Sequence, residues 1–308
     1  MNFIAIFLLL ISGAVTVLAQ TTAYSHGDPT PEEQLMLEYI NRARANPTEE
    51  GIRLMDTKDP AVQGAYSYFK IDNAKTKQAF AGYPQRPPLA FHPLLIQASR
   101  NHTADMDEKN FQGHTSSNGD EMGQRYIKVG YASMGMSGEN VAAYSESVWH
   151  GHCGLNVDWG EENQKVLGHR SNIMNYNNSV YTEIGVGITI NGKGPSQGWV
   201  GPYVVTQNFG VRSQRYILGV VYIDKNNNNF YDIGEGVSGV MVKPSRGSFH
   251  AVSSTSGGFA IPYSGPGSVT IVASGGGLPA NISKTIELTG ENVKVDFVPA
   301  SAGPGTLT

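Results

Sequence analysis

The feature that most constrains the fold of this chain is a change of hydrophobic pattern near residue 215. Before this point, apolar residues recur at helical spacing in several segments, and two alternating β-branched runs follow. After Ile217 only short alternating runs remain, separated by turn residues. A chain of 308 residues is long enough for two domains with sizeable cores. The pattern therefore predicts an α+β domain over residues 28–212 and a small all-β sandwich over residues 216–300.

Helices are predicted where capping residues flank an apolar face. Thr30-Pro31-Glu32-Glu33 starts the first helix with a hydroxyl cap, a proline in the first turn and two carboxylates near the positive end of the helix dipole. Asn46-Pro47 ends this helix. The later helices are expected at residues 65–69, 74–80, 94–111 and 122–129.

Strands are predicted where β-branched and aromatic residues alternate with polar ones. In the first domain these runs cover residues 183–190 and 199–209. Because the helices precede the strands, this domain should be α+β or three-layered rather than a βαβ repeat. In the second domain the runs cover residues 219–223, 240–242, 259–261, 269–272, 285–288 and 293–297.

Residues 1–19 are predicted to be a secretion signal. An apolar stretch runs from Phe3 through Leu18, and Val17-Leu18-Ala19 has the small-residue pattern that precedes a cleavage site. The alternative is an uncleaved membrane anchor, but the stretch is short for a span and contains Ser12 and Gly13. We therefore expect a secreted, extracellular protein without a stable membrane span.

Charge and cysteine content narrow the possible functions. The net charge is −4 and the chain has no basic run, so we expect no nucleic-acid partner. Cys153 is the single cysteine, which excludes an intramolecular disulfide. The fold must therefore depend on packing, with help from any bound metal.

Three polar residues set among glycines suggest a shared site. Glu139 lies in Gly138-Glu139-Asn140-Val141-Ala142, His114 follows Gly113, and His169 follows Gly168. Imidazoles and a carboxylate can together hold a borderline divalent metal or transfer protons near neutral pH. The alternative is that Glu139 caps a loop and the two histidines are ordinary, partly exposed residues.

His102, His150 and His152 are weaker candidates for metal ligands. His150-Gly151-His152-Cys153 offers zinc-ligand types, but neighbouring positions on a helix diverge, and only three donors lie close together. We expect the Cys153 thiol to be a buried apolar group. His102 lies on the apolar face of its helix and is expected to be a core histidine with its hydrogen bonds satisfied.

Six short motifs occur in order along the first domain: Ile40–Pro47, Ala104-Asp105-Met106 with His114-Thr115-Ser116, Gly138–Ala142, Gly168–Met174, Glu183–Gly187 and Val205–Gly210. Together they resemble the CAP superfamily, which contains cysteine-rich secretory proteins, insect antigen 5 allergens and plant pathogenesis-related proteins. The resemblance covers about residues 30 to 212 and is greatest to the bacterial, disulfide-free branch. It implies an α-β-α sandwich with one open cleft.

The resemblance also implies a site. Two histidines and two acids line the cleft in many family members, and some bind zinc or another divalent ion there. By motif, the histidines correspond to His114 and His169, and the first acid corresponds to Glu139. The second acid corresponds to Glu162 in Trp159-Gly160-Glu161-Glu162, with Asp158 as the alternative.

Most family members are described as binding proteins, so the leading expectation is a secreted protein that binds an extracellular lipid, cell-wall or protein ligand. The runner-up is a metal-dependent hydrolase that acts on peptide or cell-wall material, because two histidines and one or two acids leave coordination positions for water. No Ser or Cys nucleophile has a convincing histidine partner in the sequence. A third reading is a purely structural adhesin.

A second metal site is predicted in the second domain. Counted from the first aspartate, oxygen donors recur with the spacing of an EF-hand calcium loop, and Asn229 takes the sixth position that normally holds glycine. The flanks are strands, and residues 217–297 resemble the B-type repeats of bacterial surface adhesins and carboxypeptidase-regulatory-like sandwiches. The alternative is an asparagine-rich hairpin loop without metal. The expected calcium ligands are Asp224, Asn226, Asn228, the carbonyl of Phe230, Asp232 and Glu235.

Overall fold

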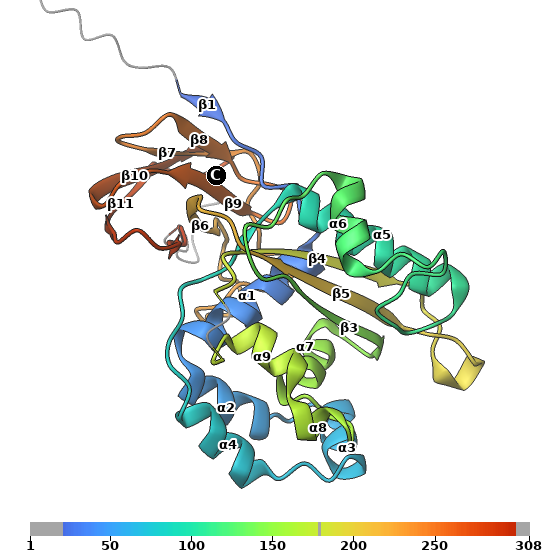
Figure 1. The fold of residues 1–308 in the computed structure, drawn as a ribbon. Coiled ribbons are helices and arrows are strands. Elements are labelled where there is room, and N and C mark those ends of the chain that lie inside the picture. The colour runs from blue at the N-terminus through green and yellow to red at the C-terminus, as the bar shows by residue number, and fades with distance from the viewer. Residues whose placement is uncertain (1–20, 178–179, 300–308) are drawn as a thin grey trace, which may run out of the picture.

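The computed structural model describes residues 21–177 and 180–299 (Figure 1). The predicted signal peptide lies outside the described residues. The first part of the chain contains most of the helices, and the chain after residue 215 is built from strands, as the change of sequence pattern predicts. Among the described helices, none has the length and apolar character needed to cross a membrane.

The first helix, α1 (Pro31–Ala45), begins as the sequence predicts. The Thr30 side chain accepts from the backbone N–H of Glu33, and the Glu33 carboxylate accepts from the backbone N–H of Thr30. Asn46 ends α1 but also caps a second helix, α2 (Pro47–Met55), through a hydrogen bond from the Glu49 N–H. The sequence analysis did not expect α2. Pro47 is tolerated there because the first turn of a helix needs no N–H donor.

The remaining helices of the first part follow at irregular intervals. Two of them, α3 and α4, are the short pieces expected between residues 51 and 88. Two others, α5 and α6, match the predicted amphipathic segments. The bounds are α3 (Pro60–Tyr68), α4 (Asn73–Ala81), α5 (Pro93–Lys109), α6 (Met122–Val129), α7 (Val148–Val157), α8 (Asn163–Val166) and α9 (Gly168–Met174), with a 3-10 turn η1 (Pro195–Gln197).

A four-stranded sheet in the order β2-β4-β5-β3 forms the middle layer. Its strands are β2 (Ala90–Phe91), β3 (Gly138–Ser145), β4 (Glu183–Ile190) and β5 (Tyr203–Gly210). The helix α5 packs against one face so closely that a Cβ at Gly185 would lie 2.0 Å from the carbonyl carbon of Leu95. Helices α1, α7 and α9 lie on the other side of the sheet (Figure 1). This is the expected α-β-α arrangement.

The second part is a sandwich of two sheets, ordered β12-β6-β9 and β1-β8-β7-β10-β11. Apolar residues from both sheets form its core, including Ile217, Val242, Phe259 and Ile271. The short strand β1, which precedes the first domain, pairs in parallel with β8 and was not foreseen. The strands are β1 (Thr22–Ala23), β6 (Arg215–Val220), β7 (Val240–Pro244), β8 (Phe249–Val252), β9 (Gly258–Tyr263), β10 (Gly267–Gly275), β11 (Ile282–Leu288) and β12 (Val293–Lys294).

The two parts are in direct contact. The side chain of Asn292 in the sandwich donates to the carbonyls of Thr182 (2.7 Å) and Pro88 (3.0 Å) in the first part. Lys294 Nζ lies 2.9 Å from the carboxylate of Glu38 on α1. Tyr231, from the predicted calcium loop, is buried in the core of the first part. The sandwich is therefore packed against the helices rather than joined to them by a linker alone.

Candidate functional site

The first half of the site joins His114 to Glu139. Glu139 lies on β3 and its side chain is buried, whereas His114 lies in the loop after α5 and its side chain is 55% exposed. Nδ1 of His114 lies 3.0 Å from Oε1 of Glu139. Arg125 on α6 donates to Oε2 of Glu139 (2.5 Å) and to the carbonyl of His114 (2.9 Å). One arginine therefore fixes both members of the pair.

The Glu139 carboxylate is fully occupied by these neighbours. In the amide orientation that satisfies its surroundings, Asn208 also donates to Oε2 of Glu139 (3.0 Å). Glu139 therefore lies behind the imidazole of His114 and orients it. The sequence analysis expected Glu139 itself to be a metal ligand; in this arrangement both of its oxygens already accept hydrogen bonds.

The second half joins His169 to Asp158. Oδ1 of Asp158 lies 2.8 Å from Nδ1 of His169, and Oδ2 accepts from the backbone N–H of Arg170 (3.1 Å). Asp158 is completely buried at the C-terminus of α7, in a left-handed conformation with φ 61°. His169 is at the start of α9, and 20% of its side chain is exposed.

The acid that contacts His169 is therefore Asp158, the alternative that the sequence left open, and not Glu162. Glu162 is at the start of α8, its side chain is 82% exposed, and it pairs with Lys165 at 2.7 Å. The Trp-x-x-Glu spacing suggested Glu162, but the segment between Trp149 and His169 forms the extra turn α8, which carries Glu162 to the surface.

The two histidines face a common region. Their ring centroids are 6.5 Å apart at an interplanar angle of 31°. In each ring the Nδ1 contacts a carboxylate. The Nε2 of each ring has no protein partner in the described part of the chain. Such an arrangement sets the tautomer of a neutral imidazole whose Nε2 can accept a proton, a hydrogen bond or a metal ion.

The imidazoles of His114 and His169 meet only some of the requirements of a metal site. Two neutral imidazoles with carboxylates behind them are typical of zinc ligation. However, within residues 21–177 and 180–299 no group of three or more His, Cys, Asp or Glu side chains is arranged to hold a metal ion. The geometry therefore suits two protein ligands with the remaining positions left to water or ligand, and not a closed structural site.

The other histidines are not part of this site. His102 is fully buried, and its ring nitrogens contact Ser116 Oγ (3.1 Å) and the carbonyl of Gly113 (2.9 Å), which confirms the expected core histidine. Burial lowers the pKa of His102. Ser116 therefore contacts His102 rather than His114, and no carboxylate completes a nucleophile triad there.

Helix α7 separates the zinc-ligand types of the His-Gly-His-Cys segment. Nε2 of His152 lies 2.9 Å from Glu50 in the core, whereas His150 contacts Trp159. Cys153 is fully buried, and burial raises the pKa of its thiol well above the usual value. The expected divergence of these side chains is confirmed.

A groove of about 640 Å³ extends from His169 between α3, β3 and α7. Aromatic side chains form much of its wall: Tyr68 is 80% exposed, Tyr144 is 48% exposed, and Phe69 stacks on Trp159 at 6.1 Å and 12°. Nδ1 of the groove residue His150 is buried and has no hydrogen-bond partner. The sequence analysis missed this wall because its residues come from separate helices with no shared motif.

The predicted calcium loop is well ordered by hydrogen bonds. Oδ2 of Asp232 accepts from the side-chain amides of Asn226 and Asn228, each at 2.7 Å. The carboxylate of Asp224 accepts from the backbone N–H of Asn229 at 2.9 Å. Asn229 has φ 58°, so the expected left-handed turn at the sixth position is confirmed.

The side chains of this loop offer the oxygen ligands that calcium prefers, but in the present arrangement its three acids, Asp224, Asp232 and Glu235, do not form a group that could hold a metal ion. In the present arrangement the amide nitrogens of Asn226 and Asn228 face Asp232. Calcium would require both amides to turn their oxygens inward, which is a half-turn about one bond. Both oxygens of Glu235 already accept from backbone N–H groups, at 2.8 Å and 2.9 Å.

Comparison with known proteins gives a family match to the first part of the chain. The model of the CAP family, described as "Cysteine-rich secretory protein family", matches residues 37–209. A similar solved structure is that of an extracellular protein containing an SCP domain from Bacillus anthracis str. Ames, with 22% identity and a TM-score of 0.32. The match covers 51% of this chain and 45% of that chain, so it spans less than half of that protein. No curated protein matches the chain.

Proposed function

The chain belongs to the cysteine-rich secretory protein (CAP) family, and on this premise we propose that it is a secreted protein whose CAP cleft binds an extracellular ligand. The observation that carries the proposal is the groove that opens beside His169. Its volume of about 640 Å³ lies within the range of ligand sites, which is roughly 300–1,000 Å³.

The composition of the groove suits an amphipathic ligand, because aromatic side chains line it together with polar ones. Exposed aromatic side chains such as Tyr68 and Tyr144 give a large contact area, and they are unusual on a surface that binds nothing. His169, whose Nδ1 is held by Asp158, lines the same groove and offers its Nε2 for a hydrogen bond. Lipid, cell-wall and protein ligands remain the candidates.

We propose that His114 and His169 hold a divalent ion, with zinc as the first candidate. Glu139 and Asp158 would orient the two imidazoles from behind. When bound, such an ion supplies a Lewis acid and a site for water. The sandwich would carry calcium in the 224–235 loop, where it stabilises the loop.

Ligand binding can be tested by co-sedimentation with insoluble peptidoglycan and, separately, with phosphatidylcholine vesicles. We expect Tyr144→Ser to weaken binding to one of these materials several-fold. Ile127→Ser is the matched control, because Ile127 is 77% exposed on α6 and does not line the groove. Equal binding by the two variants would contradict the assignment of the groove.

A metal-dependent hydrolase is the second candidate. The observation that favours it is the pair of accessible imidazoles, each held in one tautomer by a buried carboxylate. The double variant His114→Ala/His169→Ala distinguishes the roles. Loss of metal with retained ligand binding supports the binding protein, and loss of a measurable turnover on peptide or cell-wall substrates supports the hydrolase. A double variant unchanged in metal content, ligand binding and turnover supports a structural adhesin.

A further inference from the structure

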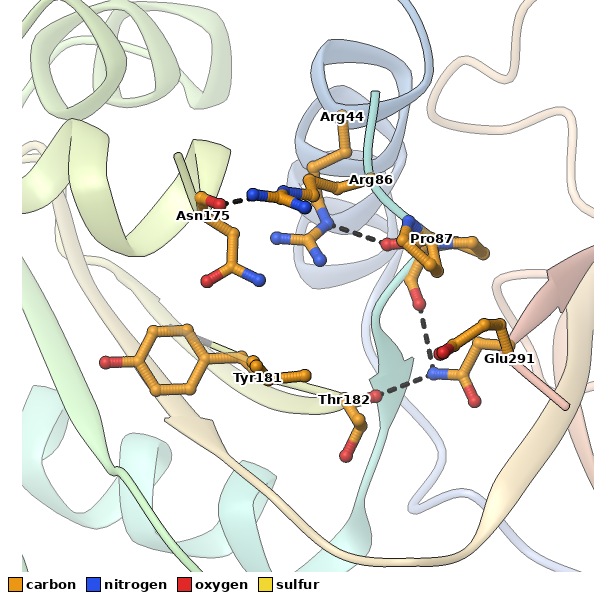
Figure 2. A pocket seen from close by; sticks show the side chains of 10 residues that line it. Arg44, Arg86, Pro87, Asn175, Tyr181, Thr182 and Glu291 are labelled. Carbon is orange, nitrogen blue, oxygen red and sulfur yellow. Dashed lines mark hydrogen bonds between the residues drawn. The ribbon is translucent and has the colours of Figure 1, made fainter. Parts of the chain in front are cut away.

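A second cavity lies at the junction of the CAP domain and the sandwich. Its volume is about 190 Å³, and Figure 2 shows the side chains that line it. The CAP side contributes the end of α1, the loop before β2, the residue after α9 and the three residues that precede β4. The sandwich contributes Glu291 and Asn292. Neither His114 nor His169 lines it, so it is separate from the proposed cleft site.

The cavity contains a buried positive charge without a carboxylate partner. Arg44 is only 1% exposed, and it donates to the carbonyls of Pro87 and Ile173, each at 2.9 Å. Its Nη2 has no hydrogen-bond partner among the described residues. Burial, together with the charge of Arg86, lowers the pKa of Arg44 to about 9. A buried cation that meets only carbonyl groups is poorly compensated.

A second guanidinium lines the same cavity. Arg86 donates through Nε to the backbone carbonyl of Asn175 (2.8 Å), and its own backbone N–H donates to the carbonyl of Arg44 (2.9 Å). No partner for its terminal nitrogens is found in the described chain. The two like charges repel, which is why the charge of Arg86 contributes to lowering the pKa of Arg44.

The remaining polar groups of the cavity do not neutralise these charges. Asn175 is 4% exposed, and no hydrogen-bond partner of its buried Oδ1 is found among the described residues. Figure 2 shows its amide in the cavity, on the same side as the guanidinium groups. Among the described lining residues Glu291 is the one acid, but it is half exposed and lies 3.6 Å from Arg215. The cavity therefore contains two cations and an unsatisfied amide.

We propose that this cavity binds a small oxyanion, of the phosphate or carboxylate class, between Arg44 and Arg86. Guanidinium groups bind such anions through paired, charge-assisted hydrogen bonds. The amide nitrogen of Asn175, which Figure 2 shows on the side of the guanidinium groups, supplies a further donor. The volume is below that of typical drug-sized ligand sites but ample for a single oxyanion with a few waters, each of about 30 Å³.

Such an anion would also strengthen the junction between the two domains. The cavity wall includes Asn292, whose amide donates to Pro88 and Thr182 on the CAP side. A ligand that binds only the folded state raises stability with its concentration. The unfolding temperature should therefore rise with phosphate at constant ionic strength.

The test is isothermal titration of the whole protein with inorganic phosphate, together with thermal unfolding in phosphate, sulfate, acetate, a soluble phosphomonoester or chloride at matched ionic strength. Arg86→Gln should weaken phosphate binding by about tenfold or more. Asn175→Asp places a negative charge in the cavity at nearly constant shape and should abolish binding. Arg44 is left unchanged, because its loss could prevent folding.

Arg246→Gln is the matched control. Arg246 also donates to two carbonyls, of Pro266 and Gly267, but it lies on the exposed surface of the sandwich. It should retain wild-type binding. Stabilisation by acetate but not by phosphate would assign the carboxylate class, and stabilisation by the phosphomonoester alone would assign an end group of a larger molecule.

Absence of binding by all these anions at millimolar concentration would overturn the proposal. Equal phosphate binding by Arg86→Gln and Arg246→Gln would also overturn the proposal. Either outcome would mean that Arg44 and Arg86 have only a structural role. Phosphate binding at this cavity should not depend on the cleft site. His114→Ala should therefore leave both the affinity for phosphate and the phosphate-dependent rise in unfolding temperature unchanged.

Discussion

The buried carboxylate of Asp158 lies 2.8 Å from Nδ1 of His169, whose ring remains partly accessible at the groove. The carboxylate therefore determines which ring nitrogen is available to a ligand. Removing its charge while keeping its shape tests this relationship directly.

Asp158→Asn should lower zinc affinity by about tenfold to a hundredfold, because the amide no longer stabilises the Nδ1–H tautomer of His169. The measurement is a competitive chelator titration, with circular dichroism to verify the fold. Glu162→Gln is the control and should match the wild type, since Glu162 is exposed and pairs with Lys165. A loss of affinity confined to Glu162→Gln would contradict the assignment of Asp158.

The Asp158–His169 pair also shows which part of the site could be predicted from the sequence. The family resemblance predicted that His114, Glu139 and His169 share one site, because each of them lies in one of the short motifs that carry the resemblance. The choice between Asp158 and Glu162 depended on the path of the chain through α8, which no local pattern specifies.

Capping residues predicted the start of α1 and the apolar pattern predicted α5, but longer-range features did not follow from sequence. The strand β1 forms because Thr22 and Ala23 reach β8 from more than two hundred residues away. The aromatic groove combines α3 with α7, and the arginine cavity combines α1 with the sandwich. Such juxtapositions depend on packing between distant segments, which periodicity does not encode.

The calcium loop allows a prediction about ligand-linked stability. Calcium at about a hundred times its dissociation constant should stabilise the wild-type protein by about 2.7 kcal/mol. Asp232→Asn should lose most of this response, because Asp232 is the acceptor toward which Asn226 and Asn228 converge. Asp56→Asn, at an exposed ion pair on the CAP domain, should keep it. Thermal unfolding with calcium or with chelator measures the difference, and elemental analysis counts calcium and zinc in each variant.

The same loop is docked on the CAP domain through Phe230. Its ring stacks on Tyr39 at 5.5 Å and 9°, and the guanidinium of Arg42 lies 4.6 Å from its centroid. Phe230→Ala should lower the free energy of unfolding by about 2 kcal/mol, which is below the cost for a fully buried phenylalanine. Urea denaturation measures this loss.

A double-mutant cycle with Tyr39→Ala isolates the contact between the two rings. We expect a coupling energy of about 0.5–1.5 kcal/mol. A coupling energy near zero would show that the two rings are adjacent without stabilising the domain junction.

His26 makes the stability of the fold depend on pH. It is 4% exposed against Phe91, and its Nε2 has no hydrogen-bond partner. Burial lowers its pKa from 6.5 to about 4, although Asp28 opposes the shift. The unfolded chain therefore binds a proton between pH 6.5 and 4 that the folded chain excludes, so stability falls as the pH falls through this window.

Across this window His26 should lower the free energy of unfolding by about 3 kcal/mol, because a pKa difference of 1 between the folded and unfolded chain corresponds to about 1.4 kcal/mol. His26→Gln removes the titrating group and should flatten the fall in stability between pH 6.5 and 4, even if it lowers stability at pH 7. Urea midpoints at pH 7, 5.5 and 4.5 measure the slope. The same slope in wild type and variant would mean that acid sensitivity arises elsewhere, with His92 as the next candidate because burial also lowers its pKa to about 4.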